Sequence, residues 1–122
     1  MKASSWSNWT RWNGSLAQTL DDAQKQVAGD DPIATARKSA GQDGTHSVLD
    51  VTSFGPKAAP GTCWVLSAAE LHQHFGSKLP TKKVIESGLA QFLESLKLGE
   101  AVAVTAYVRG TPSAVLFAGW PG

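Results

Sequence analysis

Length, composition and charge are those of one folded domain. The chain has 122 residues, of which 42% are hydrophobic and 17% are charged, as in globular and not in disordered proteins. A net charge of +1 argues against nucleic acid as a partner, and a single cysteine excludes an internal disulfide. No segment has the length and apolar character of a membrane span. The N-terminus lacks the apolar run of a signal peptide, so we expect a cytoplasmic protein, or one secreted by a route that needs no signal peptide.

The first predicted element is a long amphipathic helix. Apart from Asn13, apolar side chains recur at alternating steps of three and four over residues 6–27, which is the spacing of one helix face. A Gly-Asp-Asp-Pro sequence at residues 29–32 would end this helix. We interpret residues 1–31 as a helix that packs on its own domain. Its Trp-rich start leaves a second interpretation open, an arm that docks on a partner protein or a membrane surface.

Shorter elements are predicted in the middle of the chain. Residues 33–40 favour a short helix, and the glycines at residues 41–44 favour a turn. Residues 48–54 alternate between apolar and polar, which is typical of a strand. Two prolines and two glycines then make residues 55–61 a loop.

Two interpretations are open for residues 62–76. In the first, Thr62 caps a helix that carries Cys63 in its first turn. In the second, Ser67 and Glu70 form a capping box, the helix begins later, and residues 63–66 are a strand. Gly76 ends the helix in both.

The last third of the chain predicts one helix and two strands. Thr81 would cap a helix over residues 82–98, which has a buried apolar stripe. Residues 101–108 and 114–120 are apolar on both faces, so we expect two central, covered strands. Residues 110–113, which join them, are few enough for a hairpin.

Cys63 is the main candidate for chemistry. In the first turn of a helix, unpaired N–H groups would lower the pKa of its thiol and favour a nucleophilic thiolate. The alternative is an inert, buried small residue.

Three segments together resemble papain-like cysteine peptidases. Residues 61–67 read Gly-Thr-Cys-Trp-Val-Leu-Ser and resemble the Gly-Ser-Cys-Trp-Ala-Phe-Ser sequence around the nucleophile of that family. Residues 98–104 and 113–120 are similar, in family order, to two of its core strands. The compact spacing is closer to bacterial and effector-type members. The resemblance implies an α+β fold for the single domain of residues 1–122, with a papain-like core over residues 45–122. In that core a helix bearing the cysteine packs on an antiparallel sheet.

The resemblance also implies positions for a catalytic site. Cys63 would be the nucleophile, Ser113 stands at the position of the general-base histidine, and Lys57 stands at the position of the oxyanion-hole glutamine. A serine cannot accept a thiol proton near neutral pH. We therefore expect an inactive or impaired peptidase scaffold. His46 is an alternative base, as in circularly permuted relatives.

The sequence thus supports two functions. The leading hypothesis is a thiol-hydrolase scaffold that acts on a peptide or protein substrate. The alternative is a non-enzymatic protein–protein interaction or membrane-surface docking module that uses the Trp-rich N-terminal segment. His72 and His74 are two residues apart on one predicted helix and face different directions, so we expect no metal site and no cofactor.

Overall fold

The protein has an α+β fold, as predicted. The computed structural model describes residues 5–28, 51, 53–59 and 62–120. The helix predicted over residues 33–40, the turn over 41–44 and the first part of the strand over 48–54 lie outside this range. In chain order the elements are β1 (Trp6–Arg11), α1 (Leu16–Ala28), β2 (Ser53–Gly55), β3 (Thr62–Val65), α3 (Ala68–Phe75), α4 (Lys82–Leu93), β4 (Ala101–Val108) and β5 (Thr111–Gly119).

The strands form one mixed sheet in the order β1-β5-β4-β3-β2. β5 is antiparallel to both of its neighbours, β1 and β4, whereas β3 is parallel to both β2 and β4. The prediction of a purely antiparallel sheet is therefore wrong. The reason is the connection from β3 to β4, which passes through α3 and α4 and returns the chain in the same direction, as helical crossovers do.

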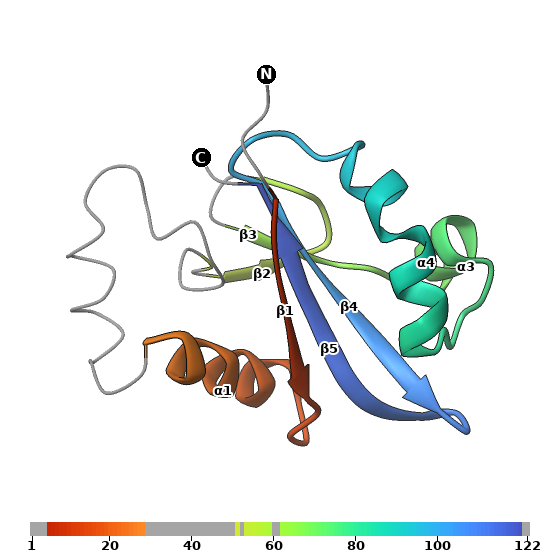
Figure 1. Cartoon of the computed structure of the whole chain (residues 1–122), viewed down its shortest axis with the longest axis horizontal. Helices are drawn as coiled ribbons and strands as arrows, with labels where there is room; N and C mark the ends of the chain where they lie inside the picture. Colours follow the sequence, from red (N-terminus) through yellow and green to blue (C-terminus); the bar gives the residue numbers. More distant parts are fainter. Residues whose placement is uncertain (1–4, 29–50, 52, 60–61, 121–122) are drawn as a thin grey trace.

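Helices cover both faces of this sheet, with α1 on one side and α3 and α4 on the other (Figure 1). Each face has its own apolar core. The core on the α3/α4 side includes Leu71, Phe75, Ile85, Phe92, Val102, Val104 and Leu116. The core on the α1 side includes Ala23, Val51, Cys63, Ala103, Val115 and Phe117. Within the described ranges, no helix combines the length and the apolar character needed to span a membrane.

The N-terminal segment differs from its prediction. Trp6–Arg11 is a strand, and only Leu16–Ala28 is helical. Tryptophan and threonine favour strands, and Gly14 has a φ of 81°, a conformation that ends regular structure and suits glycine. Trp6 and Trp12 pack on the α1 side of the sheet and Trp9 packs on the other side. The helix predicted for the Trp-rich start is therefore wrong, because these residues form β1 and their tryptophans pack against the protein's own cores. Docking of this segment on a partner or a membrane surface stays a prediction.

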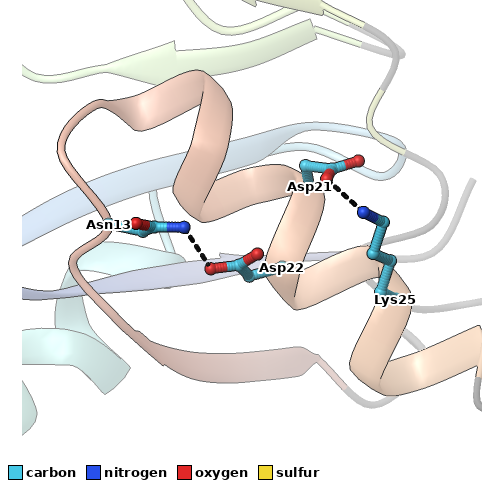
Figure 2. A network of polar contacts seen from close by, with 4 residues as sticks. All are labelled: Asn13, Asp21, Asp22 and Lys25. Atoms are coloured by element: carbon cyan, nitrogen blue, oxygen red, sulfur yellow. Dashed lines mark hydrogen bonds and ion pairs between the residues drawn. The ribbon is translucent and has the colours of Figure 1, made fainter.

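Hydrogen bonds fix the turn between β1 and α1. The buried Thr19 hydroxyl accepts a bond from the Asn13 backbone N–H at 3.0 Å and donates one to the Ser15 carbonyl at 2.7 Å. The Asn13 side chain donates to Asp22 at 2.8 Å, and an exposed Asp21–Lys25 ion pair lies one turn away (Figure 2). The buried pair of bonds at Thr19 contributes most to stability, since exposed ion pairs contribute little.

The C-terminal elements agree with the sequence except at their ends. Thr81 caps α4 as predicted, but α4 ends at Leu93 and not at residue 98. β4 and β5 form the predicted hairpin, with a turn at Arg109 and Gly110. Both turn residues have positive φ, 52° and 77°, as the favoured two-residue hairpin turn requires. β5 therefore begins at Thr111, three residues earlier than predicted.

Candidate functional site

Cys63 lies within β3 and is completely buried, with 0% of the residue exposed. It is paired with Phe54 of β2 on one side and with Ala101 of β4 on the other. Burial raises the pKa of its thiol from 9.0 to about 12, because the apolar surroundings disfavour the charged thiolate. At neutral pH this cysteine is a protonated core residue.

The prediction that Cys63 opens a helix is therefore wrong, and the alternative start at Ser67 is confirmed. The Ser67 hydroxyl accepts from the Glu70 backbone N–H at 3.2 Å, and the Glu70 carboxylate accepts from the Ser67 backbone N–H at 2.9 Å. This capping box satisfies two N–H groups at the start of α3. The residues before it include Thr62, Trp64 and Val65, whose branched and aromatic side chains favour a strand.

Ser113 lies far from Cys63, near the opposite end of the sheet. Cys63 is opposite Ala101, Ala101 is opposite Gly119, and Ser113 precedes Gly119 by six residues on β5. At about 3.3 Å per residue, this offset separates the two side chains by roughly 20 Å. The Ser113 hydroxyl instead donates to the Ala106 carbonyl at 3.3 Å. The structure does not bring the predicted nucleophile and base position together.

Of the other predicted site residues, the structure describes Lys57 and not His46. Lys57 is exposed in the connection between β2 and β3. His46 lies outside the described residues. Over the described part of the chain, no group of three or more histidine, cysteine, aspartate or glutamate side chains is placed to hold a metal ion.

α3 and α4 enclose a cleft in the described part of the chain. Its volume is about 370 Å³, which falls in the size range of small-ligand sites. Two of its lining residues, Gln73 and His74, come from α3. The other four come from α4 and the turn after it: Gly88, Gln91, Phe92 and Ser95. Amide, imidazole and hydroxyl groups therefore line the cleft together with one aromatic ring.

Three aromatic rings pack against one another at the cleft. His74 meets Phe92 edge to face at 4.7 Å between ring centroids. Trp64, from β3, packs against both, at 6.1 Å from His74 and 5.6 Å from Phe92. Such edge-to-face and tilted contacts are favourable for aromatic rings. They hold the His74 imidazole in one position at the cleft wall.

Gly88 allows the two helices to approach each other closely. A Cβ atom at this position would lie 3.2 Å from Cδ1 of Phe75 and 3.8 Å from the His74 carbonyl oxygen. Any larger residue would press against α3, so glycine sets the narrow base of the cleft.

A carboxylate and an unpaired indole lie close to this wall. The pKa of Glu70 is lowered, mainly because its carboxylate accepts the Ser67 backbone N–H bond, with smaller contributions from the Ser67 side chain and from nearby His74. The Nε1 atom of Trp64 is buried and has no hydrogen-bond partner of acceptable geometry. We therefore assign no Trp64–Glu70 bond. The indole N–H is a donor without an acceptor, beneath a half-buried histidine.

This cleft was not predicted from the sequence. Phe92 falls in the apolar stripe predicted for residues 82–98, and His74 was considered only as a metal ligand or as a partner of the Cys63 thiol, neither of which points to a cleft. The capping box at Ser67 was the available signal, because it fixes the start of α3. Gly88 within the next helix was a second signal, since an interior glycine often marks a close approach.

Comparison of the chain with protein-family models, curated proteins and solved structures gives no match. The relationship to papain-like peptidases therefore stays a prediction. The segments that carry the resemblance form β3, the start of β4 and most of β5, which are neighbours in one sheet.

Proposed function

We propose that the protein is a non-enzymatic interaction module that binds a short peptide segment of a partner protein in the cleft between α3 and α4. The observation that carries this proposal is the combination of two glutamines on facing helices with a buried aromatic floor.

The glutamines suit the backbone of a bound peptide. Gln73 on α3 and Gln91 on α4 are both exposed and line the same cleft. Each side-chain amide has N–H donors and a carbonyl acceptor. These match the C=O acceptor and the N–H donor of a peptide group. Two such side chains can bind consecutive backbone groups of an extended segment without selecting its side chains.

The aromatic floor supplies the apolar part of the site. Phe92 is buried and is held by His74 and Trp64. A rigid ring with a few placed polar groups around it is the usual composition of a binding pocket. One apolar side chain of the bound segment would contact the ring edge, while the amides hold the backbone on either side.

The same cleft lacks the parts of a hydrolase. Its only hydroxyl nucleophile, Ser95, donates a 2.6 Å hydrogen bond to the Phe92 carbonyl, so its proton is not directed at His74. Cys63 belongs to the core on the opposite face of the sheet. Binding therefore agrees with this geometry better than acyl transfer does.

The thiol hydrolase suggested by the resemblance stays as the alternative function. It requires Cys63 to reach a substrate and a base, and Ser113 does not supply that base within the described geometry. Conversion to an active arrangement would require β3 to leave the sheet.

Variants of the two glutamines test the proposed site. Peptides would first be selected from a random library against the folded protein, and their affinities measured by fluorescence anisotropy. We expect the double variant Gln73→Ala/Gln91→Ala to bind about tenfold to thirtyfold more weakly, because two hydrogen bonds of about 1 kcal/mol each are lost.

Gln26→Ala is the matched control. Gln26 is an exposed glutamine on α1, on the other side of the sheet, and its loss should leave the affinity unchanged. Equal affinity of the wild type and the double variant for every selected peptide would refute a binding site in this cleft.

A further inference from the structure

β1 is an edge strand with an unpaired side. It pairs with β5 in an unbroken antiparallel register, and no described strand lies on its other side. The Trp12 N–H bonds to the Ser113 carbonyl at 3.0 Å, and these two residues are directly opposite each other. Hydrogen-bonding direction alternates along a strand. The backbone groups of Trp6, Asn8, Thr10 and Trp12 therefore point to β5.

It follows that Ser7, Trp9 and Arg11 direct their backbone N–H and C=O groups away from the sheet. None of the described hydrogen bonds uses these groups. The next outward N–H, on Asn13, is bound by the Thr19 hydroxyl, which marks the end of the open edge. Three N–H donors and three C=O acceptors therefore form a row along the outer edge of β1.

The residues of β1 themselves offer little protection against pairing. Proteins commonly protect edge strands with lysine, proline, inward-pointing charge or a bulge. β1 has none of these along its length, and its one charge, Arg11, stands at its end.

We infer that two copies of the chain associate by antiparallel pairing of β1 with β1, with Trp9 opposite Trp9 of the second copy. The two β1 strands can form hydrogen bonds only in registers that place an outward-pointing residue of one copy opposite an outward-pointing residue of the other. The register centred on Trp9 uses all three outward residues, because Ser7 then faces Arg11 of the second copy. Each such pair exchanges two bonds, so about six form. Sliding by two residues in either direction would lose some of them.

The side chains agree with this register. On the α3/α4 face, Trp9 meets its own copy, and Ser7 meets Arg11, so the two arginines are not opposed. On the α1 face, Trp6 meets Trp12, and Asn8 meets Thr10. Aromatic pairs stabilise neighbouring strands, and like charges directly opposite would destabilise them. The result is a two-fold dimer with one continuous sheet, an interface in which each copy presents the same surface.

One charge opposes the pairing. The Lys82 ammonium lies 5.0 Å from the Trp9 ring centroid, so a Trp9 pair brings two lysines towards the two-fold axis. Lys82 is exposed, and its repulsion is screened over about 8 Å at physiological ionic strength. The pairing is therefore best measured at that ionic strength.

Substitutions of Ser7 test both the pairing and its register. Ser7 is exposed and its N–H points outward, so proline at this position removes only bonds to the second copy and is compatible with an edge strand. Sedimentation velocity of the full chain over a range of concentrations should show a monomer–dimer equilibrium. Ser7→Pro should weaken the dimer at least about tenfold, while the circular dichroism spectrum and the unfolding midpoint show that the variant is folded.

Charge at the same position tests the register. Ser7→Lys places a cation opposite Arg11 of the second copy and should weaken the dimer, whereas Ser7→Glu should tighten it. If the wild-type protein stays monomeric at the highest concentration, the inference is overturned. This holds even if the edge of β1 pairs with a strand of a different protein. The inference is also overturned by a dimer that Ser7→Pro leaves intact, or by one that the lysine and glutamate variants shift equally. The glutamine variants of the cleft should dimerise as the wild type does, so this test is independent of peptide binding.

Discussion

The thiol of Cys63 packs in the core on the α1 side of the sheet, in the same cluster as Val51 and Phe117. Its chemistry follows from that position. A thiolate there would lose its hydration without gaining a cation or a helix N-terminus, and burial is the cause of the raised pKa. The same residue in the first turn of a helix would have had the opposite shift. The identity of the side chain was evident from the sequence, but its burial was not.

This burial predicts a pH dependence of stability. The pKa of Cys63 is about 12 in the folded protein, against 9.0 for an ordinary thiol. The unfolded chain therefore releases the proton first as the pH rises. The stabilisation is fully present below pH 9.0 and is lost as the pH approaches 12. Between pH 9 and about 11, the free energy of unfolding of the wild type should fall by up to about 1.4 kcal/mol per pH unit more than that of Cys63→Ala.

The measurement is urea denaturation of both proteins at a series of pH values. The cavity left by Cys63→Ala lowers stability at every pH, so only the difference in slope is informative. Parallel pH curves for the two proteins would show that the thiol is not buried as described.

At the scale of elements, capping residues predicted where helices start. The periodicity of apolar residues was a poorer guide to how long the helices are. Thr81 at the start of α4 and the Ser67–Glu70 capping box of α3 are both present in the structure. The periodic pattern over residues 6–27 was wrong for its first half. Trp6, Trp9 and Trp12 match one helix face, but they equally match a strand whose two faces both pack against a core. Burial on both faces removes the alternation that would have identified β1 as a strand.

The capping box of α3 gives a test at this scale. Ser67→Ala removes the hydroxyl acceptor of the Glu70 N–H and leaves an unpaired donor at the start of the helix. We expect the free energy of unfolding to fall by about 1 kcal/mol, measured by denaturant unfolding. Ser87→Ala is the matched control, because Ser87 is exposed within α4 and its hydroxyl only returns to the Lys83 carbonyl. The account of α3 would be contradicted if both variants lost the same stability.

At the scale of the whole molecule, the sheet order and the cleft depend on contacts between distant parts of the chain. β1 joins β5, the first and last described strands, over more than a hundred residues of sequence. No local pattern specifies that pairing. The cleft likewise forms only where α3 and α4 meet, and the spacing within either helix does not reveal it. The α+β class and the C-terminal hairpin were predictable because they depend on turn residues and apolar runs.

The central claim is that Cys63 is a closed residue of the core on the α1 side of the sheet. The rate of alkylation of the native protein by iodoacetamide near pH 8 tests it most directly. The raised pKa alone leaves about a thousandfold less thiolate than in a free thiol peptide. We predict a rate at least about a thousandfold below that of the peptide, restored when the protein is unfolded in denaturant. A native rate equal to or faster than that of the peptide would contradict the account and favour the thiol hydrolase.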